Sequence, residues 1–342
     1  MRAAYSANVH IHILGLVVLA VSCQAQSSPL FGDDSVLDMQ LSGPLSTLIE
    51  AKTDSQELPF TLHANGIEHR VAVRVRGKSR VRECKFPPLR INFSKDDTGP
   101  TVFLDQDKLK LVTHCRDSAG AQTSVLKEYA AYRIFNLISD VSYKVRLLRI
   151  QYTDTDGRMP EQTFVRYGYF IQSASELADS VGGKPVQVPA VSAAYLDTEQ
   201  SAKVFVFQYL IGNTDWSLVT ADLDSSCCHN GDLVEIESKA FHVPYDFDQS
   251  GLANARYARP DSSLKISKVT QRLYRGYCIS PDVLRSAIVA VAQRKNDILG
   301  VLPQLPGLAA KDVATAVRFL ERYFELATDA DRLTKSFNQK CL

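Results

Sequence analysis

The spacing of hydrophobic residues changes about halfway along this chain of 342 residues. In the first half, apolar and polar residues alternate over short runs such as Val71–Arg76 and Leu89–Phe93, which is typical of half-buried β-strands. In the second half, apolar residues recur at helical spacing, as along Ala310–Ala327, which indicates amphipathic helices. The chain is therefore expected to be an α+β protein, with a β-rich part followed by a helix-rich part.

Turn and capping signals divide these patterns into elements. Asn65-Gly66 lies between two such runs and is a strong hairpin signal. Ser280 and Pro281 suit the N-cap and the first position of a helix. The expected strands cover residues 60–63, 71–76, 89–93, 109–112, 145–152 and 163–172. The expected helices cover residues 123–139, 198–212, 281–299, 310–327 and 330–339.

Residues 1–25 are typical of an export signal. Arg2 precedes an apolar stretch that is too short to span a bilayer comfortably, and small residues follow that stretch. Cleavage is expected before Gln26 or before Cys23, where the preceding Ala20-Val21-Ser22 also loosely resembles a lipoprotein box. The protein is expected to be exported, as a periplasmic, secreted or membrane-tethered protein, with a lipid on Cys23 as its one membrane attachment.

Beyond the signal, the composition predicts three parts. Residues 26–35 are rich in Ser, Pro, Gly and Asp and suit a linker. The β-rich part is expected over 36–175 and the helix-rich part over 176–342, which would form two lobes with a ligand cleft between them. The 39 Lys and Arg residues balance 38 Asp and Glu, so no basic excess favours nucleic acid as a partner.

Six of the seven cysteines lie beyond Cys23, and an even number in an exported chain suggests disulfides. The first expected pair is Cys84 with Cys115, because they flank a predicted strand pair. The second is Cys227 or Cys228 with Cys278. A zinc site at Cys227-Cys228-His229 is the alternative, although adjacent cysteines do not easily chelate one ion.

Several polar groups suit phosphate chemistry. Arg76-Gly77-Lys78-Ser79-Arg80 is a tight turn of glycine, hydroxyl and cations after a strand, and such turns present backbone N–H groups and positive charge to phosphate. Lys85 is expected on the following strand, with Cys84 and Phe86, and Glu128 on the first long helix. A lysine on a strand that pairs with a glutamate on a helix is how kinases hold the α- and β-phosphates of a nucleotide.

Carboxylates gather in the second half. Asp215 lies in a polar turn beside the single tryptophan. Asp246 and Asp248 lie two apart among apolar residues, and they would share a face if this segment is a strand. Two anions on one face repel each other unless a cation lies between them, and magnesium with substrate phosphates is the usual solution.

On these motifs the chain resembles the secretory spore-coat CotH-type kinases, relatives of the protein-kinase-like fold. The resemblance rests on Arg76-Gly77-Lys78-Ser79, Lys85-Phe86-Pro87, Gly212-Asn213-Thr214-Asp215 and Asp246-Phe247-Asp248. It implies a bilobal kinase-like fold and a nucleotide such as ATP with magnesium in the cleft. Asp215 would orient or deprotonate the acceptor, Asp246 would hold the metal, and Asp248 could support it. The acceptor would be an envelope or extracellular protein.

The chain departs from the family pattern in its catalytic loop. Ser217 stands where the family has histidine, and Thr220 stands where it has the metal-binding asparagine. Asn230, from a longer loop, is the candidate to supply that ligand. If it does not, the resemblance implies a degenerate member that keeps the fold and binds a ligand or partner without catalysis.

A hydrolase is the third possibility. Asp215 and Asp246 could act as an acid–base pair, as in glycosidases, or Ser79 could act as a nucleophile with His114. The sequence contains neither a Gly-x-Ser-x-Gly elbow nor a HExxH motif.

Overall fold

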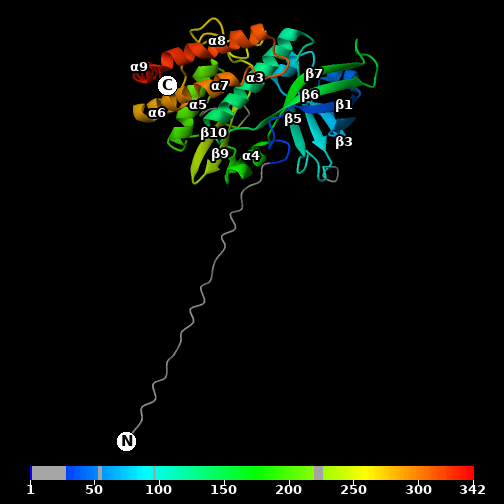
Figure 1. Ribbon diagram of the computed structural model, residues 1–342, viewed down its shortest axis with the longest axis horizontal. Coiled ribbons are helices and arrows are strands. Elements are labelled where there is room, and N and C mark those ends of the chain that lie inside the picture. The colour runs from blue at the N-terminus through cyan, green and yellow to red at the C-terminus, as the bar shows by residue number, and fades with distance from the viewer. Residues whose placement is uncertain (2–27, 53–55, 95–97, 219–225) are drawn as a thin grey trace.

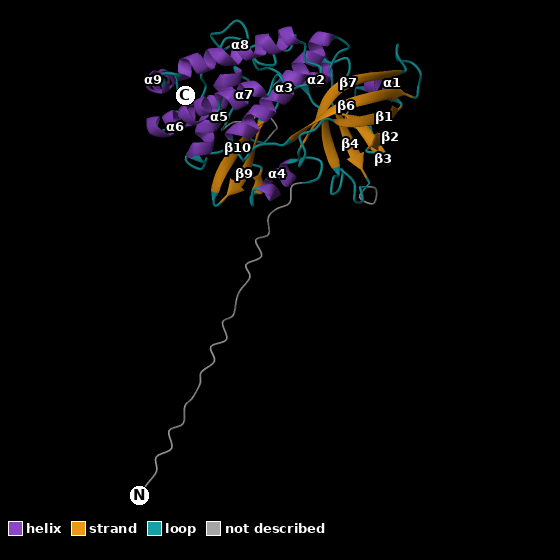
Figure 2. Ribbon diagram, viewed as in Figure 1, coloured by secondary structure: helices purple, strands orange, loops and turns teal. Residues whose placement is uncertain are grey.

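The computed structural model describes residues 1, 28–52, 56–94, 98–218 and 226–342. Residues 2–25 of the expected signal peptide, which include Cys23, and Thr220 lie outside these residues. The described chain is a mixed α+β structure, with a β-barrel beside a group of helices (Figures 1 and 2).

A closed barrel forms the first half, with strand order β1-β2-β3-β4-β5-β7-β6. β1 closes it by pairing in parallel with β6, and the other neighbours are antiparallel. Its strands are β1 (Leu37–Gly43), β2 (Leu58–Ala64), β3 (Ile67–Val75), β4 (Leu89–Phe93), β5 (Lys108–Val112), β6 (Val145–Asp154) and β7 (Thr163–Ile171). Closure leaves no edge strand in this sheet. The sequence predicted every barrel strand except β1.

Alternation along each strand fills the barrel. In β1 the burial pattern repeats every second residue, because successive side chains point to opposite faces. Leu41, Val73 and Ile91 are fully buried in one core cluster inside the barrel. The predicted hairpin is confirmed: β2 and β3 meet at Asn65 (φ 50°) and Gly66 (φ 77°), the left-handed conformations that a type I′ turn requires.

Helices dominate the second half, from α4 onward, while α1 to α3 lie among the barrel strands in sequence order. The described helices are α1 (Leu45–Ala51), α2 (Ser79–Glu83), α3 (Ala119–Ile138), α4 (Ala174–Ser180), α5 (Thr198–Ile211), α6 (Pro281–Gln293), α7 (Lys295–Gly300), α8 (Ala310–Ala327) and α9 (Ala330–Asn338). A small antiparallel sheet has the order β10 (Lys239–Pro244), β9 (Gly231–Ile236), β8 (Lys184–Val186). The five predicted helices are confirmed, with 281–299 divided into α6 and α7.

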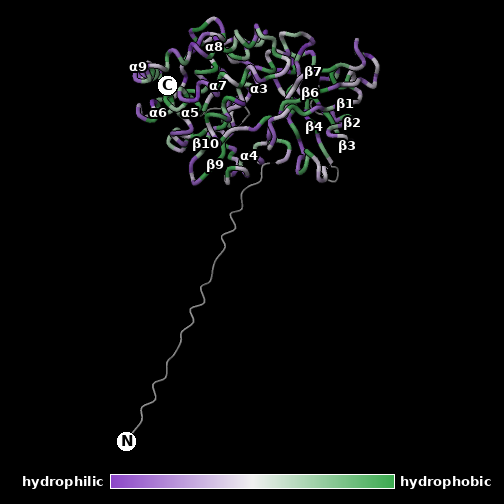
Figure 3. The backbone as a smooth tube through the Cα atoms, viewed as in Figure 1, coloured by the Kyte–Doolittle hydropathy of each residue, from purple (hydrophilic) through white to green (hydrophobic). Residues whose placement is uncertain are grey.

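Two large hydrophobic cores organise the described residues. One fills the barrel, and the other joins α3, the outer faces of β6 and β7, and the helices of the second half. Figure 3 shows hydrophobic segments, in green, in both the barrel and the helical half. The barrel ends at Ile171, close to the predicted boundary at 175, but α3 shares its core with the second half. The surface where the barrel meets the helices is called the seam below.

Three disulfides join the six described cysteines. Cys84–Cys115 is confirmed: Phe86 and Cys115 form an isolated β-bridge, which brings the neighbouring segments together. The pairing of Cys227 or Cys228 with Cys278 is wrong. Cys227 bonds to Cys228, and Cys278 bonds to Cys341 near the C-terminus. Cys278 precedes the predicted helix that begins at 281, and Cys341 follows the predicted helix 330–339. These two helix ends meet only in the folded chain, so sequence spacing could not reveal this pair.

In the described part of the chain, no helix combines the length and the apolar character needed to cross a membrane.

Candidate functional site

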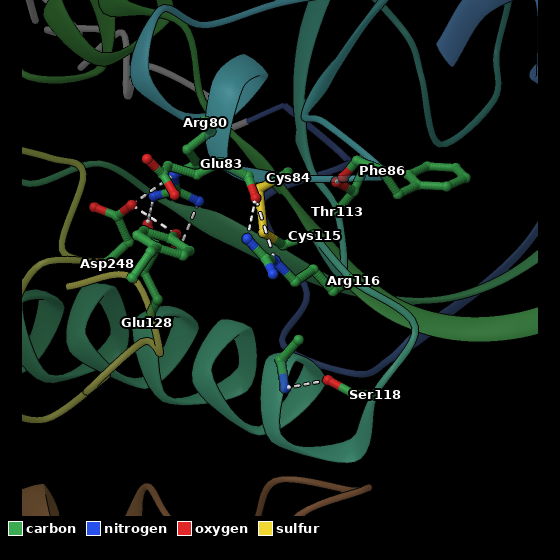
Figure 4. The surroundings of a disulfide bond; sticks show 12 residues. Arg80, Glu83, Cys84, Phe86, Thr113, Cys115, Arg116, Ser118, Glu128 and Asp248 are labelled. Atoms are coloured by element: carbon green, nitrogen blue, oxygen red, sulfur yellow. Dashed lines mark hydrogen bonds and ion pairs between the residues drawn. A yellow bond between two sulfur atoms is a disulfide. The ribbon is translucent and has the colours of Figure 1, made fainter. Parts of the chain in front are cut away.

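Arg80 lies at the centre of three carboxylates in the seam. Its Nη1 donates to Glu128 Oε2 at 3.0 Å, its Nε lies 3.0 Å from Asp248 Oδ2, and its Nη2 contacts Glu128 and Asp246. The Arg80 side chain is 8% exposed. Figure 4 shows Arg80 facing Glu128 on α3 and Asp248 from the segment after β10. One guanidinium therefore joins the barrel, α3 and the second half.

The segment of Asp246 and Asp248 is not a strand, but the two carboxylates do converge, on Arg80. β10 ends at Pro244, and Asp246 has a left-handed backbone (φ 61°). Phe247 is fully buried, with its ring 4.6 Å from that of Tyr132 and 5.2 Å from that of Phe207. This buried ring fixes the turn, so the carboxylates on either side of it both reach Arg80.

Electrostatics reflect this burial. Burial alone would lower the pKa of Arg80, but the three surrounding carboxylates outweigh it and raise that pKa well above the ordinary value. Burial raises the pKa of Glu128 and of Asp248, while Arg80 opposes the rise. Asp248 also accepts a hydrogen bond from the Tyr257 hydroxyl at 2.8 Å. The carboxylates are thus strongly coupled to one cation.

Asp215 forms a second cluster with two residues of the following segment. Its Oδ1 lies 2.8 Å from His229 Nε2, and Asn230 Nδ2 donates to its Oδ2 at 3.0 Å and to its carbonyl at 2.7 Å. The Asp215 backbone N–H donates to Asn213 Oδ1 at 3.0 Å. The Asp215 side chain is 40% exposed, so its carboxylate is oriented and still accessible.

A chain of contacts joins the two clusters. The Tyr245 N–H donates to the Asn230 carbonyl at 3.0 Å, and the next residue is Asp246. The Asp246 N–H donates to the Tyr132 hydroxyl on α3 at 2.9 Å. The predicted residues Glu128, Asp215, Asn230, Asp246 and Asp248 therefore belong to one continuous array.

Two partly buried cations, Lys110 and Arg76, interact electrostatically with Asp246 of this array. Lys110 on β5 lies 5.9 Å from the ring centre of Tyr143 and 5.7 Å from that of Tyr245. Burial lowers the pKa of Lys110 and of Arg76. The charge of Asp246 partly offsets this for Arg76, and the charges of Asp232 and then Asp246 partly offset it for Lys110. Among the described residues, neither cation has a carboxylate oxygen within 4.0 Å.

The predicted pair of Lys85 and Glu128 is wrong. Lys85 is exposed, and Arg80 is the ion-pair partner of Glu128. The prediction failed because residues 79–83 form the short helix α2, which turns Arg80 rather than Lys85 toward α3. Sequence reasoning also missed Lys110, whose signal was a polar residue within an alternating strand just before the helix that carries Glu128.

The predicted turn after β3 is present. Gly77 has a φ of 97°, which favours glycine, and Gly77, Lys78 and Ser79 are exposed. The hydrolase pair finds no support, since His114 is 2% exposed with its ring 4.5 Å from that of Phe86, while Ser79 is exposed at the start of α2.

The carboxylates do not fit a magnesium site in this arrangement. Asp246 and Asp248, which sequence reasoning assigned to the metal, both contact the Arg80 guanidinium, and the side-chain amide nitrogen of Asn230 donates to Asp215. Within the described ranges, no group of three or more His, Cys, Asp or Glu side chains is arranged to hold a metal ion. Arg80 supplies the positive charge that the sequence had attributed to the metal.

A polar cavity of about 400 Å³ opens beside Asp215. It is also lined by His229, Gln249, Arg259 and Arg275. Arg275 donates from Nη1 to the carbonyl of Thr214, next to Asp215. The cavity could admit a small polar group or one side chain of a larger molecule to the Asp215 carboxylate.

No protein family and no curated protein matches the sequence. Among solved structures, the chain is similar to the Helicobacter pylori proinflammatory kinase CtkA, with a TM-score of 0.38 and 10% sequence identity. The similarity covers 83% of this chain and 93% of that one. At this identity and TM-score, the similarity decides neither the activity nor the residues of the site.

Proposed function

We propose that this chain is an exported kinase-like phosphotransferase that binds a nucleotide such as ATP at the seam. The observation that carries the proposal is the pair of partly buried cations, Arg76 and Lys110. Both have a pKa lowered by burial, and neither has a carboxylate within 4.0 Å among the described residues. A polyphosphate would supply the missing negative charge.

Asp215 is the proposed base. It would accept the proton of an acceptor hydroxyl as the hydroxyl oxygen bonds to the terminal phosphorus. The bond from that phosphorus to the bridging oxygen would break, and the nucleoside diphosphate would leave. His229 and Asn230 hold the Asp215 carboxylate, and the cavity beside it would admit the acceptor. Magnesium takes no part in this mechanism, because Arg80 contacts Asp246 and Asp248, the two residues expected to bind it.

Three disulfides support the export part of the proposal, because such bonds persist in oxidising compartments. An envelope or extracellular protein is then the proposed acceptor. The proposed lipid tether depends on Cys23, which lies outside the described residues.

A binding-only protein of the same fold is the second candidate. It is favoured by Arg80, which occupies the carboxylates that catalysis with a metal would need. Ser217, in place of the histidine of the family pattern, agrees with it. Such a protein would bind the phosphate ligand without transferring it.

Thermal denaturation with and without ATP tests the binding step. ATP should raise the Tm of the wild type and of the control Lys85→Met, whose side chain is exposed. The same ATP concentration should raise the Tm of Lys110→Met or Arg76→Met much less. Equal shifts in all four proteins would contradict the proposed phosphate site.

Transfer of labelled γ-phosphate separates the two candidates. A phosphotransferase should label an envelope protein, and Asp215→Asn should lower the rate at least 100-fold while ATP still raises its Tm. Binding of ATP without any transfer would favour the binding-only protein.

A further inference from the structure

Arg80 is fully engaged by the carboxylates around it. Each of its three side-chain nitrogens contacts a carboxylate oxygen, from Glu128, Asp246 or Asp248. The planar guanidinium matches carboxylates with its fixed set of donors. Magnesium needs oxygens at about 2.0–2.1 Å in an octahedral arrangement, so the same oxygens cannot serve both cations at once.

The backbone around Arg80 is clamped in this position. The Arg80 carbonyl accepts a hydrogen bond from the Cys84 N–H at 2.8 Å, and Cys84 is bonded to Cys115. Arg116 Nη2 donates to the Glu83 carbonyl at 2.7 Å, and its Nε donates to the same carbonyl at 3.2 Å. Figure 4 shows these contacts between α2 and the segment before α3. Arg80 is thus built into the site and does not reach it from a free loop.

Displacement of Arg80 by a metal would be unfavourable. Its side chain is 8% exposed, and those of Glu128 and Asp248 are 2% and 7% exposed. A divalent ion that took these oxygens would leave a buried guanidinium without a partner, and an unpaired buried charge is strongly destabilising.

We infer that Arg80 is the permanent cation of this site and takes the place of a divalent metal. It is a positioning residue: it holds Asp246 and Asp248 between the barrel and α3, so that Arg76 and Lys110 can bind a polyphosphate without a metal. The part that concerns polyphosphate rests on the proposed function. The exclusion of a metal by Arg80 does not depend on the proposed function.

Manganese binding, followed by electron paramagnetic resonance, tests the exclusion directly. The protein is used with its disulfides intact. The wild type and the control Lys85→Gln should bind Mn²⁺ only weakly. Arg80→Gln should bind it at least 10-fold more tightly, because three carboxylates lose their cation, and the added substitution Asp246→Asn should remove this gain. Arg80→Lys, which keeps the charge, should return the affinity toward the wild-type value.

Two results would overturn the inference. The first is tight Mn²⁺ binding by the wild type that is lost in Asp246→Asn. The second is a folded Arg80→Gln, judged by circular dichroism, whose Mn²⁺ affinity is unchanged. If Arg80→Gln does not fold, the comparison of the wild type with Asp246→Asn decides alone: weak binding by both supports the inference.

Binding of ATP tests the second part. Titration calorimetry should give the wild type the same ATP affinity, within twofold, in magnesium and in EDTA. A loss of tenfold or more in EDTA would overturn metal-independent binding. If ATP binds in neither buffer, the proposed nucleotide site is wrong, while the Mn²⁺ measurements still decide the role of Arg80.

Discussion

At the residue scale, Arg80 determines how the charges of the seam are arranged. It is the cation shared by Glu128, Asp246 and Asp248. Lys85, which the sequence led us to pair with Glu128, is exposed. Arg80 and Lys85 lie five residues apart, yet Arg80 is central to the site and Lys85 is exposed to solvent. The reason is that α2 and the disulfide at Cys84 come between them, so that the two side chains point in different directions.

Replacement of Arg80 is expected to destabilise the protein strongly. Arg80→Gln should lower the free energy of unfolding by about 3–5 kcal/mol, because buried carboxylates lose their partner. Lys85→Gln should change it by less than about 0.5 kcal/mol, as is usual for an exposed side chain. Urea denaturation at pH 7 measures both, and similar losses for the two variants would contradict the buried cluster.

His114 should make stability depend on pH. Burial lowers its pKa to about 3, whereas the unfolded chain takes up a proton near pH 6.5. The stabilisation is therefore present above pH 6.5 and is lost as the pH falls toward 3. Between pH 7.5 and 5.5 the loss should be about 1.4 kcal/mol.

The comparison with His114→Phe isolates this residue, since every other group titrates in both proteins. Urea denaturation at the two pH values should show a smaller loss in His114→Phe than in the wild type. Equal losses would mean that His114 can accept a proton in the folded protein.

At the element scale, the conformations of two short segments are stabilised by a disulfide and by one buried aromatic ring. α2 contains five residues, too few for an isolated helix to be stable in water. The Cys84–Cys115 disulfide and the Arg116 contacts hold it against the start of α3. The turn at Asp246 depends in the same way on Phe247, which is packed between α3 and α5.

Removal of the Cys84–Cys115 bond should affect both stability and ligand binding. Its ends are 31 residues apart, and a loop of this length corresponds to about 3.5 kcal/mol of stabilisation. Cys84→Ala with Cys115→Ala should lower the Tm and weaken ATP binding, because α2 no longer holds Arg80 in place.

The bond between Cys278 and Cys341 provides the matched control. Its ends are 63 residues apart, so its removal should cost about 4 kcal/mol by the same argument. Calorimetry should show no change in ATP affinity for this folded variant. Equal weakening by both double variants would show that ATP binding follows global stability and not the position of α2.

At the scale of the whole molecule, two cores meet at a charged seam. The barrel has its own core, and α3 belongs to the core of the second half. Arg80 follows the barrel strand β3, while Asp246 and Asp248 follow β10, so the cluster links segments more than 160 residues apart. A ligand between Arg76, Lys110 and Asp215 would contact both halves.

The disulfides should form only where the chain is oxidised. Protein exported to the bacterial periplasm should yield the linked peptides of Cys84–Cys115 and Cys278–Cys341 in non-reducing mass spectrometry, and a single peptide with Cys227 and Cys228 that lacks two hydrogens. Protein retained in the cytosol should carry free thiols at these positions. A peptide that links Cys227 or Cys228 to Cys278 would contradict the structure.

The sequence by itself determined the elements and part of the site. Alternation located six barrel strands, helical spacing located five helices, and Asn65-Gly66 located a hairpin, because these signals depend on neighbours in the chain. It also singled out Asp215, Asp246 and Asp248. Barrel closure by β1 and β6, the pairing of Cys278 with Cys341, and the choice of Arg80 over Lys85 were decided only by tertiary structure. Each of these depends on contacts between segments far apart in sequence. Such contacts are decided by how the elements pack, and local sequence patterns do not encode that packing.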